Sequence, residues 1–181
     1  HKDFRYVNDQ YKWSSELLNM EYDELYSNKT ILGRWLRSKA TVIKINDHVF
    51  VHGGVSEDFI TESDFNFEES NDIMRKSIDR TKEEMKSTNF YTTHYGTKSL
   101  IWYRGYFYDS LLDSDITKIL ERLESKHIIV GHCSNEEIVQ LYNNKIFGVD
   151  SSIKNGEYGE ILFIENDRFF RGTLDGNRLE F

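Results

Sequence analysis

Residues 49–55 have the sequence VFVHGGV, and this stretch decides how the rest of the chain is interpreted. A short apolar run ends at His52, and glycines follow it directly. Such a run is typical of a buried strand. Glycine at a strand end permits a tight turn and leaves room for another group to approach the backbone. The pattern therefore predicts a histidine at the rim of a sheet, where metal ligands and catalytic groups are common.

A second stretch has the same design. Residues 128–133 have the sequence IIVGHC, in which an apolar run ends at Gly131 and His132. Both stretches predict a buried strand that carries a histidine at its end. Since the two histidines are far apart along the chain, we expect one site assembled from distant segments.

These residues resemble the calcineurin-like metallophosphoesterases, in particular the bacterial type of the phosphoprotein-phosphatase branch. VFVHGGV is similar to the HGG motif of that family, and IIVGHC is similar to its later GH motif, which usually continues with threonine. Between them, IWYRGY at 101–106 resembles the arginine-glycine segment, and KIFGVD at 145–150 resembles the strand that ends in aspartate. The order matches that of the family. Residues 32–39, LGRWLRSK, are similar to bacterial members, so the resemblance extends over most of the chain.

Other motifs of the family do not occur in this sequence. GDxHG, GDxxDRG and GNHE are absent, and they carry most of the metal-binding carboxylates, the asparagine ligand and the histidine usually assigned as general acid. The resemblance therefore implies that residues 1–181 are the C-terminal portion of a metallophosphoesterase domain, with the N-terminal motif-bearing half missing. The expected fold class is α+β, the second half of a β-sandwich flanked by helices.

The resemblance also assigns the site residues. His52 and His132 would be ligands of one metal in a dinuclear centre of Mn, Fe or Zn, metals that imidazole suits. Arg104 would bind the substrate phosphate, because its planar charged fork holds phosphate oxygens in pairs. Asp150 would support the site through hydrogen bonds. The alternatives are ordinary histidines near a sheet edge, an arginine on a half-exposed strand face, and an aspartate that only ends a strand.

The implied function of the intact protein is metal-dependent hydrolysis of phosphate esters, on phosphoprotein or small substrates. For this chain alone we expect little activity and weak metal binding or none. The alternative function is a degenerate phosphatase fold that acts as a non-catalytic binding module. The sequence leaves open whether this chain is itself an enzyme, and whether it is cytoplasmic or periplasmic.

Composition limits the partners. The net charge of −8 would repel a nucleic-acid backbone, so no nucleic acid is expected. No apolar stretch is long enough to span a membrane. The predicted partners are the phosphorylated substrate, the missing half of the domain and further copies of the chain, since half a sandwich would expose apolar surface. The single cysteine, Cys133, is expected to be a small buried residue rather than a reactive thiol, and His1 receives no role.

Periodicity predicts the elements. Strands at 41–45 and 48–52 flank a hairpin turn at Asn46-Asp47, and His48 is expected at the surface. An extended segment is predicted at 99–108, and a capping box at 134–137 predicts a helix after His132. Further helices are predicted at 10–26, 30–38, 69–85 and 114–124, and further strands at 145–150, 161–165 and 168–171, with a short strand at the end.

Overall fold

Two β-sheets and a set of short helices organise the computed structural model, which describes residues 7–86 and 89–181. The strands are β1 Val42–Ile45, β2 His48–Val51, β3 His127–Val130, β4 Val139–Leu141, β5 Ile146–Gly148, β6 Ile161–Glu165, β7 Arg168–Gly172 and β8 Arg178–Glu180. The α-helices are α1 Asp9–Leu17, α2 Ile31–Arg37, α3 Glu57–Ser63, α4 Phe67–Ser77, α5 Lys82–Lys86, α6 Phe90–Tyr95, α7 Gly105–Tyr108 and α8 Asp113–Arg122. Two 3₁₀ turns, η1 Tyr22–Tyr26 and η2 Ile153–Asn155, complete the described elements.

The larger sheet is mixed, with the strand order β1-β2-β3-β5-β4. β2 pairs parallel to β3, and β3 pairs parallel to β5, while the outer strands β1 and β4 pair antiparallel to their neighbours. Parallel neighbours cannot be joined by a tight turn and need a long crossover. Here the helices α3 to α8 lie in the crossover from β2 to β3, so the sheet and its helices form an α/β unit.

The predicted fold class is therefore wrong. We expected an α+β arrangement, the second half of a β-sandwich, because the resemblance to metallophosphoesterases implied it and strand partners were predicted only within hairpins. The partners of β2 and β3 are each other, although a long helical segment separates them in sequence. That residues 1–181 are one portion of a larger domain stays a prediction.

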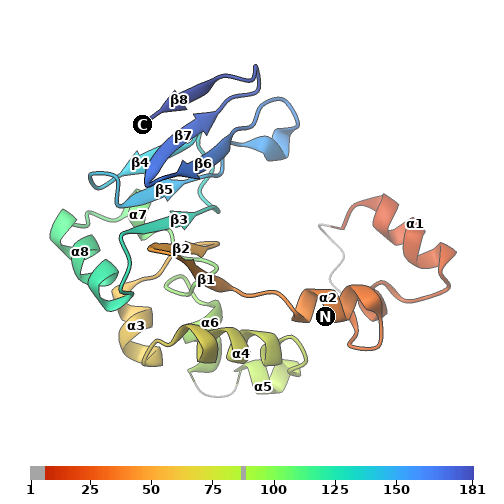
Figure 1. Cartoon of the computed structure of the whole chain (residues 1–181). Helices are drawn as coiled ribbons and strands as arrows, with labels where there is room; N and C mark the ends of the chain where they lie inside the picture. Colours follow the sequence, from red (N-terminus) through yellow and green to blue (C-terminus); the bar gives the residue numbers. More distant parts are fainter. Residues whose placement is uncertain (1–6, 87–88) are drawn as a thin grey trace.

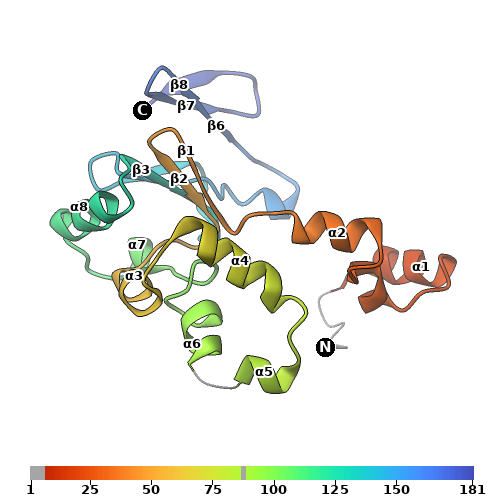
Figure 2. The ribbon, with the colours of Figure 1, turned by 60° about the horizontal axis from the view of Figure 1, so that its bottom comes forward.

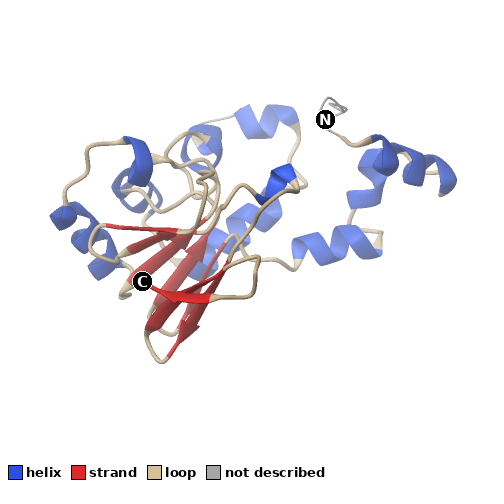
Figure 3. Cartoon of the chain, turned by 90° about the horizontal axis from the view of Figure 1, so that it is seen from above, coloured by secondary structure: helices blue, strands red, loops and turns tan. Residues whose placement is uncertain are grey.

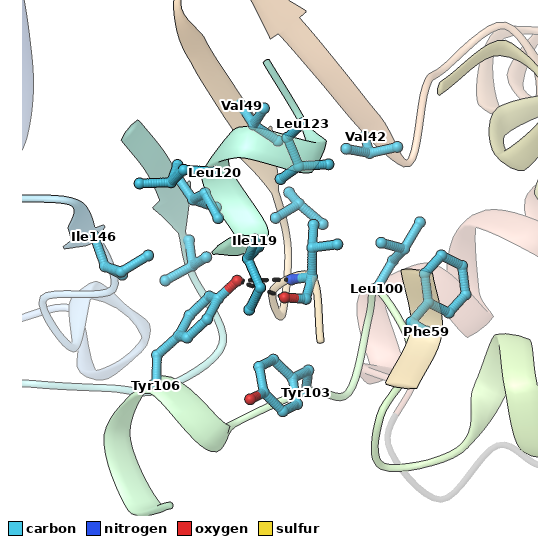
Figure 4. Packing of buried hydrophobic residues seen from close by; sticks show 14 of the residues in the cluster. Val42, Val49, Phe59, Leu100, Tyr103, Tyr106, Ile119, Leu120, Leu123 and Ile146 are labelled. Carbon is cyan, nitrogen blue, oxygen red and sulfur yellow. Dashed lines mark hydrogen bonds between the residues drawn. The ribbon is translucent and has the colours of Figure 1, made fainter. Parts of the chain in front are cut away.

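The two faces of the mixed sheet are covered differently (Figure 1). Because side chains alternate along a strand, Val49 and Ile128 point to the helical side and Phe50 and Ile129 to the opposite side. The helical side forms the main core, and Figure 4 shows part of it, with the Tyr106 hydroxyl held by hydrogen bonds to the backbone of Val55. The opposite side packs against the antiparallel sheet β6-β7-β8.

Several predicted elements are confirmed. The hairpin turns at Asn46-Asp47, where Asn46 has φ 53°, and α8 falls within the predicted 114–124 to within a residue or two. The strands β5, β6, β7 and β8 lie where they were expected. Predicted long helices are shorter and interrupted: 10–26 divides into α1 and η1, and 69–85 divides into α4 and α5.

Three local predictions are wrong. The segment 99–108 is not a strand but a turn followed by α7, and no helix follows His132. The predicted capping residue Ser134 instead donates its hydroxyl to Asp150, 2.9 Å away, so it does not cap a helix. His48 is not a surface residue, since it is only 5% exposed.

The N-terminal part of the described chain projects from the rest. In Figures 2 and 3, α1 and α2 extend to one side, away from both sheets. Arg37 at the end of α2 forms an ion pair with Asp79, after α4. None of the helices in the described ranges is long and apolar enough to cross a membrane.

Candidate functional site

The loop after β2 positions His52 through close backbone contacts. The amides of Gly53 and Gly54 both donate to the carbonyl of Leu100, at 2.8 and 3.3 Å. A Cβ on Gly53 would lie 2.9 Å from backbone atoms of Ile101 and Tyr103, so a larger residue would push this segment away. The glycines therefore let the segment that precedes Arg104 cross directly over the end of β2.

His132 lies on a strained turn after β3. The amide of Cys133 donates to the carbonyl of Gly131, 2.7 Å away, and this three-residue turn gives His132 a φ of 65°. Residues other than glycine adopt such a φ rarely, and the cost must be offset by the surrounding structure. Strained residues of this kind cluster at functional sites.

The two predicted histidines meet at the ends of the parallel strands. The Nε2 atom of His52 lies 3.0 Å from the Nδ1 atom of His132, and the amide of Gly131 donates to the carbonyl of His52. His52 is exposed, whereas the Nε2 atom of His132 is buried and has no hydrogen-bond partner among the described residues. The two histidines therefore lie side by side, as expected, and their role stays a prediction.

Charge and burial act together on His132. Burial lowers its pKa, and the positive charges of Arg104 and His52 lower it further, while Asp150 acts in the opposite direction. A neutral imidazole is therefore favoured, which can accept a proton or a hydrogen bond at one ring nitrogen.

Arg104 and Asp150 approach the histidines from separate segments. Arg104 is exposed at the start of α7, and its positive charge lowers the pKa of His132. Asp150 follows β5, and its carboxylate accepts hydrogen bonds from the hydroxyl of Ser134 and the amide of Ser152. Lys154 donates to the same Ser134 hydroxyl at 2.8 Å. The four predicted site residues thus lie at one end of the mixed sheet, and their roles stay predictions.

The site also contains residues that the sequence analysis did not identify. Trp102 is half exposed, and its ring meets the ring of His132 edge to face, with 5.2 Å between the centroids. Ser134 donates a hydrogen bond to Asp150, and Lys154 donates one to Ser134. None of the three could be found from local sequence, because each is defined by contacts with residues that lie far away along the chain.

For metal coordination these residues offer few ligands. Stable protein sites use about three or four protein ligands. Within residues 7–86 and 89–181, no group of three or more His, Cys, Asp and Glu side chains is placed to hold a metal ion. The described residues therefore do not fit the predicted dinuclear centre.

The thiol beside His132 is not placed for nucleophilic chemistry. Cys133 is 3% exposed, and burial raises its pKa. Reactive cysteines have a lowered pKa and an accessible sulfur. The expectation of a small buried residue is confirmed.

Comparison with known proteins gives a clear structural match. A solved structure described as a cold-active protein tyrosine phosphatase aligns with 99% of this chain at 39% identity and a TM-score of 0.91. This chain is similar to that phosphatase. A point mutant of a cold-active protein tyrosine phosphatase and the enzyme from a psychrophilic Shewanella species match at 38% identity, each with a TM-score of 0.91. The chain spans only about half the length of these proteins, 53% or 54%. No family model and no curated protein matches.

These comparisons correct several expectations. The matching structures are described as protein tyrosine phosphatases, which contradicts the resemblance to calcineurin-like metallophosphoesterases. The predicted requirement for two divalent metals, Mn, Fe or Zn, rested on that resemblance and is withdrawn, as is the missing metallophosphoesterase half as a partner. What remains of the prediction is the broader class, phosphatase, and a phosphorylated substrate.

Proposed function

We propose that the protein containing this chain is a phosphatase that hydrolyses phosphotyrosine in proteins. The observation that carries this proposal is the 39% identity to a cold-active protein tyrosine phosphatase over 99% of the chain. At this identity and TM-score the chain shares more than a common fold with that protein. The chain spans 53% of that protein's length, so the activity is proposed for the protein that contains this chain.

The proposed site lies at the ends of β2 and β3. Arg104 is exposed and has no ion-pair partner among the described residues, so its guanidinium is available for the phosphate oxygens. The arginine would hold the phosphate and stabilise the negative charge that develops during transfer. Asp150, tied by Ser134, would keep the segment after β5 in position beside it.

The His52–His132 pair would form the reactive edge of the site. The two ring nitrogens are 3.0 Å apart, and the pKa of His132 is held down by burial and by neighbouring positive charge. Groups with such a shifted pKa are typical of functional sites. We assign no nucleophile to Cys133, because its thiol is buried and its pKa is raised.

The test uses the full-length protein with a phosphotyrosine peptide and with a small aryl phosphate. The variants His52→Ala, His132→Ala and Arg104→Ala should each lower kcat/KM by about 100-fold or more, in the range typical of catalytic groups. Arg104→Lys should recover little, because an ammonium cannot replace the paired hydrogen bonds of a guanidinium. Inorganic phosphate should inhibit the Arg104→Ala variant more weakly than the parent.

The matched control is Arg122→Ala, which removes an exposed arginine at the end of α8. It should behave like the parent. Running each assay with and without a chelator measures separately any contribution from a tightly bound ion. Binding of the phosphotyrosine peptide without turnover would favour the alternative, a non-catalytic binding module. Undiminished turnover in all three alanine variants would contradict the proposed site.

A further inference from the structure

A cavity lies away from the His52–His132 pair, between α4, α5 and α6. It has a volume of about 810 Å³, within the range of protein ligand sites. Its lining is partly apolar, through Ile78 and Met85, and partly aromatic, through Tyr91 and Tyr95. The two tyrosine rings are stacked, with 5.9 Å between their centroids. Figure 1 shows α4, α5 and α6 on the side of the mixed sheet opposite to β6, β7 and β8.

Basic side chains line this cavity. Its lining includes Arg80, Lys82 and Lys86, and it includes no acidic residue among those described. All three are exposed, and none forms an ion pair with a described residue. Arg80 lies over the ring of Phe90, 3.7 Å from its centroid, which leaves the edge of the guanidinium open to a partner.

This local charge is opposite to that of the whole chain. The chain has a net charge of −8. Basic residues elsewhere, such as Lys126, Lys145 and Arg171, form ion pairs with acidic side chains. The effect of Arg80 reaches neighbouring groups: after burial, it is the second cause that lowers the pKa of His94 in α6. Hydrogen bonds with Thr81 lower the pKa of Glu84 of α5, and the charge of Arg80 lowers it further, but Glu84 does not line the cavity. A basic rim on an acidic protein steers a negatively charged partner to that surface.

The cavity is continuous in sequence with the proposed site. Tyr95 ends α6, and the chain then runs through Lys98, whose carbonyl accepts the hydroxyl of Ser56 at 2.8 Å. The next residues reach Leu100, whose carbonyl binds the glycines after His52, and then Arg104. The cavity is thus joined to the segment that carries Arg104 by residues 96–103.

We propose that this cavity binds an acidic peptide segment of the protein substrate. An apolar or aromatic side chain of the peptide would enter between Tyr91, Tyr95 and Met85, and flanking carboxylates would contact Arg80, Lys82 and Lys86. This rests on the proposed function for its biological meaning, but peptide binding itself is independent of turnover. The cavity would add affinity for acidic phosphoproteins without taking part in the chemistry.

The experiment measures fluorescence polarisation of a labelled peptide that has one tyrosine between glutamates, with the full-length protein. The triple variant Arg80→Glu, Lys82→Glu, Lys86→Glu should bind it at least about tenfold more weakly, because like charges would then face each other. The double variant Lys82→Glu, Lys86→Glu keeps the Arg80–Phe90 contact and should also lose affinity. Binding by the parent should weaken with added salt.

The matched control reverses three exposed cations outside the cavity, as Lys29→Glu, Arg34→Glu, Arg122→Glu, and so makes the same change in net charge. It should bind the acidic peptide nearly like the parent. Equal loss in the control, equal binding of a lysine-rich peptide, or preference for single-stranded DNA over the peptide would overturn the proposal. Turnover of a small aryl phosphate should be the same in the parent and the cavity variants. If neither the parent nor the variants hydrolyse the aryl phosphate, the proposed function fails, while the peptide-binding result still stands.

Discussion

At the scale of single residues, Cys133 shows that position beside a candidate site histidine does not make a thiol reactive. Its side chain is 3% exposed, and burial raises its pKa above the usual value. The positive charge of Arg104 acts in the opposite direction but is the weaker effect. The thiol therefore stays protonated near neutral pH and is covered by its neighbours.

Cys133→Ala should accordingly leave most of the proposed phosphatase activity in place, because the substitution removes a sulfur that is buried. In the native protein, a thiol reagent should modify Cys133 at least about tenfold more slowly than in the urea-unfolded chain. Absorbance of the released reporter follows the reaction, and circular dichroism checks the fold of the variant. Rapid native labelling together with inactivation would contradict this assignment.

The residues that sequence could and could not reveal differ in a physical way. His52 and His132 each end an apolar run beside glycine, a pattern that depends only on local geometry, and the structure brings them together. Trp102 was missed because a single aromatic residue forms no periodic pattern in the sequence. Its place in the site depends on its contact with the ring of His132. The turn at His132 was predicted as a helix start, although the hydroxyl of Ser134 goes to Asp150 instead.

At the scale of elements, a second histidine pair lies where the two sheets meet. The Nδ1 atoms of His48 and His127 are 3.0 Å apart at the beginnings of β2 and β3, and both rings contact Phe169 of β7. Burial lowers the pKa of His127 to about 4, with the charge of His48 as the next cause; Lys126 lowers it further, whereas Asp47 and Asp167 raise it. Only one of two nitrogens in such a contact can carry the shared proton.

This pair should make the fold sensitive to mild acid. Because the pKa of His127 falls from 6.5 to about 4 on folding, the unfolded chain binds more protons between these values, and stability falls as pH falls through this window. From pH 7 to pH 5 we expect His127 to account for a loss of about 1–2 kcal/mol in the free energy of unfolding. Urea unfolding at the two pH values measures it.

The control for this prediction is His127→Asn, which cannot titrate in that range. Burial lowers the pKa of His94 and of His132 as well, so the variant should retain a smaller pH dependence rather than none. Glu160 does not interfere, since its pKa lies at about 2. An unchanged difference between pH 7 and pH 5 in the variant would show that His127 is not the group responsible.

A buried ion pair joins the segment before β4 to the smaller sheet. The side chain of Glu160 is 0% exposed and accepts hydrogen bonds from Arg171 of β7 and from the amide of Ile138. Burial alone would raise the pKa of Glu160, but the bonds from Arg171, Tyr158 and Ile138 outweigh it. The carboxylate therefore stays charged inside the protein.

Removing one partner of this pair should cost far more than removing both. Arg171→Met leaves the buried Glu160 charge without its cation and should destabilise the fold by about 3–5 kcal/mol. The double variant Arg171→Met, Glu160→Leu should recover much of this loss, because neither charge is then buried. Urea unfolding of the parent, both single variants and the double variant gives the coupling energy. Additive losses would argue against a coupled pair.

At the scale of the whole molecule, the projecting N-terminal helices expose a large apolar surface. Large exposed apolar patches mark contact surfaces or promote association. On α1, α2 and the residues next to them, the exposed apolar side chains are Tyr11, Trp13, Leu17, Leu18, Ile31, Leu32 and Trp35. The expectation of self-association therefore stays a prediction, now placed on these helices instead of on an uncovered sheet.

This surface should cause concentration-dependent association of the chain. Replacing Trp13, Leu17 and Trp35 by glutamine should reduce the average mass measured by light scattering toward 21.5 kDa. The control replaces Ile161, Leu174 and Leu179, which are exposed apolar residues of the smaller sheet and its turn, by glutamine. A monomer at all concentrations, or equal effects of the two triple variants, would contradict this placement.

The arrangement of the sheets was the part of the fold least accessible from sequence. Turns such as Asn46-Asp47 are local, so their positions followed from residue type. β2 pairs with β3 although a long helical segment separates them in sequence. No periodicity of the sequence indicates this pairing. For this reason most of the strands, though not β4, were correctly predicted while the architecture built from them was wrong.

One alignment of backbones produces both histidine pairs. In the parallel pairing of β2 and β3, His48 lies opposite His127 and Val51 lies opposite Val130. Beyond that point β3 needs one more residue than β2 to reach its histidine, and the tight turn at Gly131 absorbs it. The two paired strands thus carry one histidine pair where they begin and the other just after they end. An insertion or deletion within either strand would shift one histidine pair relative to the other, so both pairs can form together only while the two strands keep their matched lengths.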